Sequence, residues 1–535
     1  MEMRNILKKK KWVSWIRFNK SEIDPLIIFT FAIALALRFG HLFFIKMDEP
    51  FRLGGLFLEF SEQIIKNHYL LPARIPYYSY QGLPFAYPPL SFYFQAVILD
   101  LFNFPKIPLV NLIPPIFSGL GVISLYFLAK NVFSKNVELI SSLLAFSLMP
   151  SAFIDHLEAA GLPESFGTLA IIWYAFFLFE LLKKQKSQQA IIAGIFLAIC
   201  VISSPGSAYA SALLSVIFAL AMFIQIMNNH SMKTILLIFI VAGVGISLSA
   251  PYWLTVMIQN GKGVFMSPFL AQHQGGSGVS FIENAINRIL GMNISGGKFG
   301  IFWNTFIFLG FLISIFNKQF ILPLSLLSMV VIPREGGWLA PIFGSLLAGV
   351  GIAGFLSKFA NGTKVSGTSN LTYKASHHIF FLAFLFLNLY SSITTISNLF
   401  HDRQLVLEAW QIESLEDARA SIPESASVVL IGNDAFNEWG PTLLKREVIN
   451  VSYGLEWEPF EQRKVNQLNA VIESGYTLSK IFWEVKNLYK LETFYIVSND
   501  KQRINELIEG NTDTIIFPKI KFDSSTINVL MVSEK

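Results

Sequence analysis

The sequence predicts a polytopic α-helical membrane protein of about eleven spans with a C-terminal extracytoplasmic α/β domain. Three observations predict this fold class. The 535 residues are 53% hydrophobic and only 14% charged, and their mean hydropathy is +0.51. Long apolar runs recur as far as residue 399, and the composition changes sharply after it. A soluble globular protein does not have this composition.

The apolar runs predict the spans. A helix of roughly 20 residues crosses the hydrocarbon layer, which is about 30 Å thick. The predicted spans are 25–45, 109–130, 137–154, 163–182, 188–203, 207–227, 233–255, 299–316, 319–333, 338–357 and 377–399. Basic residues before the first run, among them Arg4, Arg17 and Lys20, indicate a cytoplasmic N-terminus. No small-residue cleavage site follows that run, so we expect it to remain as a span.

The segment 89–102 is ambiguous between a span and a helix that lies at the membrane surface. Lys130, Lys135 and Lys318 should face the cytoplasm, and this works only if 89–102 does not cross the membrane. We therefore expect an interfacial helix on the outer face, anchored by aromatic residues such as Phe92 and Tyr93. This topology puts the C-terminus outside and predicts a multi-pass protein of the cytoplasmic (plasma) membrane.

The division into domains follows from the same composition. Residues 1–399 form the predicted transmembrane domain, with a long first outer loop at 46–108, and residues 400–535 form the predicted extracytoplasmic domain. In the second domain, the runs 427–433, 493–499, 513–518 and 526–532 have strand length, and helical stretches at 401–420 and 461–490 alternate with them. It has no GxGxxG or P-loop pattern, so nucleotide binding is not expected. A nucleic-acid partner is not expected either.

An acidic pair opens the first outer loop. Asp48 and Glu49 follow the first span within IKMDEPFRLGG. Taken alone, such a pair is more often a solvated loop start than a reactive group. At a membrane interface, however, burial tends to raise a carboxyl pKa, which suits a general base.

A second acidic cluster lies in FIDHLEAAGLPESFG, at the next outward exit. It contains Asp155, His156, Glu158 and Glu164. In a helical turn, Asp155 and Glu158 would share one face, whereas Glu164 after Pro163 could simply cap the next helix. Ionisable groups near the membrane are costly unless they are paired or functional. These residue types could hold a metal, but their spacing matches no specific metal motif.

Two further features of the outer side are candidates for substrate binding. Arg334 in PREGG could hold a phosphate through a bidentate contact, or it could extend toward lipid headgroups. Tyr87 in LPFAYPPL could line a sugar or lipid groove beside a rigid proline turn. The single cysteine, Cys200, excludes an intramolecular disulfide and a cysteine-based metal cluster.

These motifs, in this order and on one side, resemble the GT-C superfamily of polyprenyl-phosphate-sugar-dependent membrane glycosyltransferases. The resemblance is to the protein O-mannosyltransferase-like and aminoarabinose-transferase-like members. MDEP, YPPLSFY, DHLEAAGLPE, SSPG and PREGG carry it, together with EWGPTLLKREVINVSYGLEW at 438–457. The WWD-type signature of oligosaccharyltransferases is absent.

The resemblance implies an inverting transfer of a sugar from a polyprenyl-phosphate donor on the extracytoplasmic face, in cell-envelope glycan, glycoprotein or glycolipid synthesis. It implies that Asp48, or Glu49 beside it, is the base, and that Asp155 and Glu158 assist. Arg334 would hold the phosphate, with Arg52 or Arg74 as further cations, while Tyr87, His156 and Glu164 contact substrate. No cofactor is certain, but a divalent cation is possible, and the acceptor is an unknown glycan, lipid or protein.

Two other classes of protein fit the predicted topology. One is a transporter or flippase of a lipid-linked precursor, although no internal repeat is evident. The other is a non-catalytic membrane assembly protein, which would not need the acidic residues.

Overall fold

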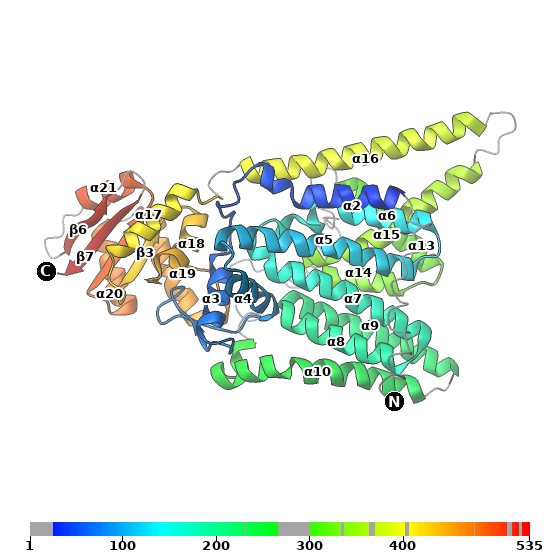
Figure 1. The fold of residues 1–535 in the computed structure, drawn as a ribbon, viewed down its shortest axis with the longest axis horizontal. Coiled ribbons are helices and arrows are strands. Elements are labelled where there is room, and N and C mark those ends of the chain that lie inside the picture. The colour runs from blue at the N-terminus through cyan, green and yellow to red at the C-terminus, as the bar shows by residue number, and fades with distance from the viewer. Residues whose placement is uncertain are drawn as a thin grey trace, which may run out of the picture.

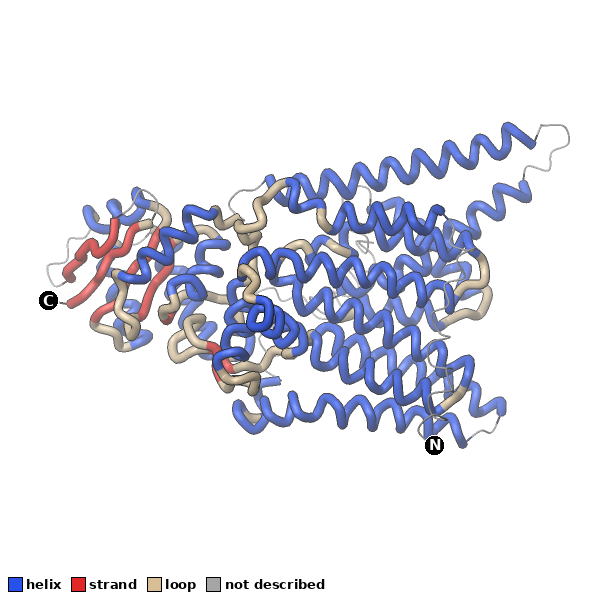
Figure 2. Tube along the Cα trace, viewed as in Figure 1, coloured by secondary structure: helices blue, strands red, loops and turns tan. Residues whose placement is uncertain are grey.

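The structure is a computed structural model, and it describes residues 25–229, 232–265, 300–332, 336–362, 370–401, 406–475, 477–510, 516–523 and 527–534. Long helices run side by side to form a bundle, and the strands of the main sheet gather beyond one end of it (Figures 1 and 2).

Each predicted span overlaps one helix of the bundle. The helices are α2 (Pro25–Arg38), α5 (Lys106–Val132), α6 (Asn136–Leu148), α7 (Leu162–Lys184), α8 (Ser187–Ser203), α9 (Pro205–Asn229), α10 (Met232–Asn260), α13 (Gly300–Phe316), α14 (Ile321–Val330), α15 (Gly336–Gly362) and α16 (Asn370–His401). Among the described residues, six helical segments are long and apolar enough to cross a membrane: 106–132, 159–184, 205–224, 235–260, 337–357 and 383–400. The predicted number of eleven spans therefore stays a prediction, because α2, α6, α8, α13 and α14 are shorter.

The first outer loop folds between the bundle and the main sheet. It contains α3 (Gly55–Lys66), a two-residue antiparallel pair of β1 (Arg74–Ile75) and β2 (Leu83–Pro84), and α4 (Leu90–Phe102). The α4 helix has 13 residues, so it is about 20 Å long and too short to cross the hydrocarbon layer. This length is consistent with the predicted interfacial helix.

The acidic turn, residues 150–161, is less regular than the single helical turn considered from the sequence. It consists of three 3-10 segments, η3 (Pro150–Ala152), η4 (Ile154–His156) and η5 (Ala159–Gly161). Glu158 has the extended angles φ −96° and ψ 157° and separates η4 from η5. A β-carbon on Gly161 would lie 2.1 Å from the carbonyl oxygen of Asp155. Only glycine therefore allows this tight fold.

The C-terminal residues alternate between helices and strands, as predicted. In order they are α17 (Ala409–Ala420), β3 (Ser427–Ile431), α18 (Asp434–Leu444), β4 (Glu447–Val448), α19 (Pro459–Glu473), α20 (Leu478–Tyr489), β5 (Thr493–Ser498), α21 (Lys501–Glu509), β6 (Ile516–Asp523) and β7 (Asn528–Glu534). The strand order is β4-β3-β5-β7-β6. The β3 strand pairs in parallel with β4 and β5, and β7 pairs antiparallel with β5 and β6.

Two expectations for this part of the chain need correction. The helical stretch 461–490 is two helices, α19 and α20, because the chain turns at Gly475 with φ +74°. The α18 helix was not predicted. It begins where the side chain of Asn433 accepts a hydrogen bond from the Phe436 amide, 2.8 Å away, which is a regular N-terminal cap. Whether these residues form an independent extracytoplasmic domain stays a prediction.

Candidate functional site

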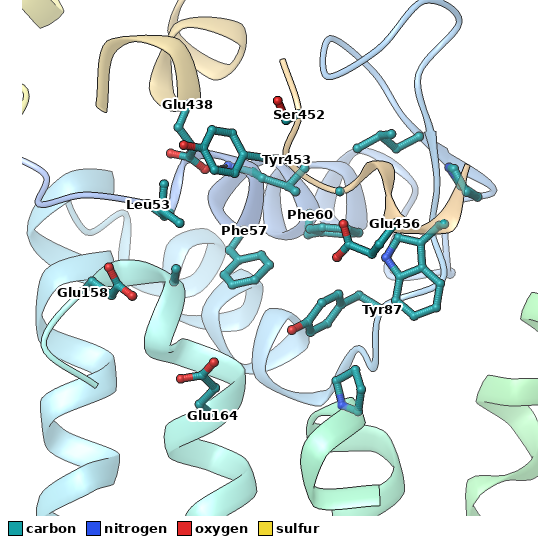
Figure 3. Close-up of a pocket in the computed structure, with 18 of the residues that line it drawn as sticks. Leu53, Phe57, Phe60, Tyr87, Glu158, Glu164, Glu438, Ser452, Tyr453 and Glu456 are labelled. Carbon is teal, nitrogen blue, oxygen red and sulfur yellow. Dashed lines mark hydrogen bonds between the residues drawn. The ribbon is translucent and has the colours of Figure 1, made fainter. Parts of the chain in front are cut away.

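Four parts of the chain surround a cavity of about 430 Å³ at the end of the bundle nearest the main sheet. They are the first outer loop, the acidic turn with the start of α7, the start of α9, and the C-terminal segment 438–462. Figure 3 shows carboxylates and aromatic rings from these parts around one space. A cavity of this size suits a small-molecule site.

The turn from Arg52 to Gly55 holds the walls together. The Trp439 indole Nε1–H donates to the Arg52 carbonyl at 2.9 Å, and the Ala160 amide donates to the Leu53 carbonyl at 2.8 Å. A β-carbon on Gly54 would lie 2.2 Å from Cβ of Ala159. The first loop, the acidic turn and α18 therefore meet without room for a side chain at Gly54.

Glu438 of α18 caps the N-terminus of α3, although the two are far apart in the sequence. Its carboxylate accepts the amide of Gly55 at 2.8 Å and that of Leu56 at 3.0 Å, at the N-terminus of α3. The N-terminal dipole of a helix stabilises a negative charge there. Burial nevertheless raises the pKa of Glu438 to about 7, although the amides of residues 54–56 favour the ionised form.

Glu158 is the buried carboxylate of the acidic turn that lines the cavity. Its side chain is 14% exposed, and its Oε2 lies 3.5 Å from Arg52 Nη1. Burial raises the pKa of Glu158 to about 7, against the attraction of Arg52 and with smaller contributions from Asp155 and Glu438. Burial also raises the pKa of Asp155, which Arg52 opposes. Near neutral pH, Glu158 can therefore both take up and release a proton.

Aromatic rings form the remaining wall. Tyr87 lies edge-on to Trp457, with ring centroids 6.2 Å apart, and its centroid is 5.3 Å from that of Phe57. Tyr453 also lines the cavity, and burial raises its pKa. Together with the carboxylates of Glu158, Glu164, Glu438 and Glu456, these rings give the cavity apolar faces and acidic groups.

His156 is not among the residues that line this cavity and lies in a buried network. Arg38, at the end of α2, donates from Nε to Ser118 Oγ at 3.0 Å, and Ser118 Oγ is 3.0 Å from His156 Nδ1. Arginine can only donate, so Ser118 Oγ accepts from Arg38, and its second lone pair or its proton serves His156 Nδ1 according to the tautomer of the ring. His156 Nε2 lies 3.4 Å from Thr168 Oγ1. His156 thus anchors the acidic turn to α5 and α7.

The other residues predicted from the sequence lie in several places. Glu164 and Tyr87 line the cavity. Asp48 is exposed and is not among the lining residues, whereas Glu49 is buried and pairs with Lys46 at 2.8 Å. Arg74 pairs with Glu458 at 2.6 Å. Arg334 lies outside the described residues.

Sequence reasoning missed the lining residues of the C-terminal segment. Glu438, Tyr453, Glu456 and Trp457 all come from EWGPTLLKREVINVSYGLEW, which had been noted only for its resemblance. Glu438 shares α18 with the exposed Asp434, so its charge alone did not mark it as a lining residue. Tyr209 of α9 was missed as well.

No group of three or more His, Cys, Asp or Glu side chains in the described ranges is arranged to hold a metal ion. A divalent cation therefore stays a prediction from the resemblance, and no step of the proposed reaction depends on one.

Comparison with known proteins gives one family match. Residues 86–254 match the family model described as dolichyl-phosphate-mannose-protein mannosyltransferase, which is less than half of the chain. The curated proteins contain no match to the sequence.

Solved structures match over nearly the whole chain. The archaeal oligosaccharyltransferase AglB from Archaeoglobus fulgidus, in complex with an inhibitory peptide and a dolichol-phosphate, is similar with a TM-score of 0.58 and 12% identity, over 94% of this chain and 74% of that one. ArnT from Cupriavidus metallidurans, bound to undecaprenyl phosphate, is similar with a TM-score of 0.55 and 13% identity, over 95% of this chain and 98% of that one. The arabinofuranosyltransferase AftD from Mycobacteria is similar with a TM-score of 0.56 and 14% identity, over 96% of this chain and 40% of that one.

The shared fold and the family match confirm the resemblance of this chain to the GT-C superfamily of membrane glycosyltransferases. The chain is accordingly a multi-pass membrane protein with the fold of that superfamily.

Proposed function

We propose that the protein is a membrane glycosyltransferase that moves a sugar from a polyprenyl-phosphate donor to an acceptor hydroxyl on the extracytoplasmic face. One observation carries the proposal. The buried carboxylate of Glu158, with a pKa raised to about 7, lines a cavity of about 430 Å³ between the helix bundle and the C-terminal segment. A proton acceptor of this kind is what an acceptor hydroxyl needs in order to attack a sugar.

The identity of the donor rests on the similar proteins. Two of the similar structures contain dolichol-phosphate or undecaprenyl phosphate, and the matching family is described by a dolichyl-phosphate sugar. The cavity adjoins the helix bundle, because α7 and α9 reach it with Glu164 and Tyr209. Aromatic faces such as Tyr87 and Trp457 offer surfaces for a sugar ring.

The reaction is a displacement at the anomeric carbon. The acceptor oxygen attacks this carbon while its proton passes to Glu158, and the bond from the anomeric carbon to the phosphate oxygen breaks. Polyprenyl phosphate leaves with the bonding electron pair. A single displacement of this kind inverts the anomeric configuration, and the phosphate leaving group needs stabilisation of its charge more than an acid.

The charge of the phosphate requires a nearby cation. Among the described residues the candidate cation is Arg52, whose Nη1 lies 3.5 Å from Glu158 Oε2. Arg334 stays a prediction from the sequence. The resemblance gives the role of base to Asp48 or Glu49, whereas the lining of the cavity favours Glu158. These two assignments make different predictions for single variants.

The test uses the purified full chain with a radiolabelled polyprenyl-phosphate sugar, and it measures the release of polyprenyl phosphate. We expect Glu158→Gln to lower the rate by about 10²–10⁴-fold, the usual range for a lost general base. Asp48→Asn should retain most of the activity. The exposed residue Glu509 provides the control variant Glu509→Gln, which should be unchanged.

Three results would count against the proposal. Loss of activity in Asp48→Asn with full activity in Glu158→Gln would return the role of base to the first loop. Transport of the lipid without release of polyprenyl phosphate would indicate a flippase. If the protein neither releases polyprenyl phosphate nor transports the lipid, the result would favour the non-catalytic assembly protein.

A further inference from the structure

A second cavity lies at the opposite end of the helix bundle. The α5 and α7 helices begin beside the candidate site and have 27 and 23 residues, so their far ends are about 35–40 Å away. The cavity there has a volume of about 1060 Å³. It is bounded by the turns 132–135 and 317–320 and by the ends of α7 and α15.

The lining of this cavity carries a net positive charge. Among its described lining residues are three lysines, Lys135, Lys183 and Lys318, and one acidic residue, Glu138. Lys135 is 3.9 Å from Glu138, and Lys183 donates to Asn131 Oδ1 at 2.7 Å. Lys318 is exposed and forms no ion pair with a described residue. An anion entering the cavity would therefore meet cations that a single carboxylate does not neutralise.

Two helices also begin at the wall of the cavity. The α6 helix starts after Lys135 and α14 starts after Phe320, and neither of these residues caps its helix with a side chain. The first amides of a helix without such a cap, together with the helix dipole, favour an anion. The first turn of α6 already carries the carboxylate of Glu138, whereas that of α14 has no acidic residue. The lysines and the start of α14 thus act in the same direction.

The apolar part of the lining identifies the kind of anion. Phe179, Ile313 and Leu356 line the same cavity as the lysines. The surrounding helices end at this level, where the headgroups of a bilayer would lie. Basic pockets between membrane helices on the cytoplasmic side are suited to anionic lipid headgroups, and the sequence predicts that Lys135, Lys183 and Lys318 face the cytoplasm.

We propose that this cavity binds the phosphate headgroup of an anionic membrane lipid, with Lys135 and Lys318 as its principal cations and the apolar wall against the acyl chains. The site is separate from the candidate active site, and its existence does not depend on the proposed transfer reaction.

The experiment compares lipids on the purified, delipidated full chain. Native mass spectrometry measures the binding of phosphatidylglycerol and of phosphatidylcholine, and inorganic phosphate is added as a competitor. The wild-type protein should bind phosphatidylglycerol more tightly than phosphatidylcholine. Each of Lys135→Gln and Lys318→Gln should weaken the binding of phosphatidylglycerol about fivefold, and the double variant roughly 25-fold.

Lys130 provides the matched control. It is an exposed lysine at the same end of α5 but does not line the cavity, so Lys130→Gln should bind phosphatidylglycerol like the wild type. Equal binding of the two lipids by the wild type would overturn the proposal without any variant. Equal weakening by Lys130→Gln would overturn it too. Displacement of phosphatidylglycerol by an equal concentration of inorganic phosphate would indicate a free-anion site instead.

Discussion

The protonation of Glu158 connects the position of one side chain to the pH dependence of the proposed reaction. Burial raises its pKa to about 7, and a general base acts only when it is deprotonated. We expect kcat/KM to fall about tenfold for each pH unit below 7 and to level off above it. The measurement is the release of polyprenyl phosphate at low donor concentration between pH 5 and 9.

The variant Glu158→Gln is the control for this profile. Its residual rate should no longer change near pH 7, because the titrating group has been removed. A profile that keeps the same midpoint in Glu158→Gln would assign the titration to another group. Glu438, which also lines the cavity and whose pKa burial raises to about 7, would then be the next residue to test.

Glu438 makes a second prediction at the scale of one residue. The variant Glu438→Ala leaves the amides of Gly55 and Leu56 without their acceptors in a buried position. A buried polar group that loses its partner costs about 1–3 kcal/mol. We therefore expect a lower midpoint of thermal unfolding, measured by tryptophan fluorescence in detergent.

The matched control lies on the same helix. Asp434 is exposed in the first turn of α18, so Asp434→Asn should change the stability by no more than about 0.5 kcal/mol. Equal midpoints for Glu438→Ala and Asp434→Asn would mean that the contact with α3 contributes no net stability.

At the scale of the element, the hydroxyl of Ser118 on α5 links α5 and α2 to the acidic turn. It accepts from Arg38 of α2 and faces Nδ1 of His156. In Ser118→Ala, both of these buried groups lose a partner. We expect a loss of about 1–3 kcal/mol in stability, seen as a lower thermal midpoint, and a lower kcat because the turn that carries Glu158 loses its anchor.

Ser124 on the same helix is the control for Ser118. Its hydroxyl donates to the carbonyl of Leu120 in its own helix, at 2.9 Å. Ser124→Ala should therefore lower the stability of the protein only slightly. If both variants behave alike, the contact between Ser118 and His156 does not anchor the turn.

The elements also show how far sequence reasoning reaches. Apolar runs predicted the helices of the bundle because a long apolar run has few other stable forms in a membrane. The acidic turn was found because charges near a membrane are unusual, and Glu158 and Glu164 do line the cavity. Glu438 could not be placed there from the sequence, because its contact with Gly55 joins residues 383 positions apart. Only long-range packing determines such a contact.

At the scale of the whole molecule, an ion-pair network joins the C-terminal segment to the first loop and to the bundle. Lys445, after α18, contacts the carboxylates of Glu59 and Glu62, the latter at 2.6 Å. Lys106, the first residue of α5, contacts Glu62 at 2.7 Å. Burial favours the neutral form of Glu62, but the two lysines outweigh it and lower its pKa. The network therefore stabilises the junction at neutral pH, and this stabilisation is lost as acid protonates Glu62 below its usual range.

The variant Lys445→Gln tests whether this network holds the cavity together. It leaves the fully buried side chain of Glu59 without its cation, and the loss of one partner of a buried pair typically costs about 3–5 kcal/mol. We expect faster hydrogen exchange in α3 and α18 and a lower rate of transfer, because both helices form the wall of the cavity.

Lys486 pairs with Glu534 at a more exposed position within the C-terminal segment. The control Lys486→Gln should therefore cost less than about 1 kcal/mol and leave the exchange of α3 unchanged. Unchanged exchange in α3 in Lys445→Gln would mean that Trp439 and Glu438 suffice to hold the C-terminal segment over the cavity.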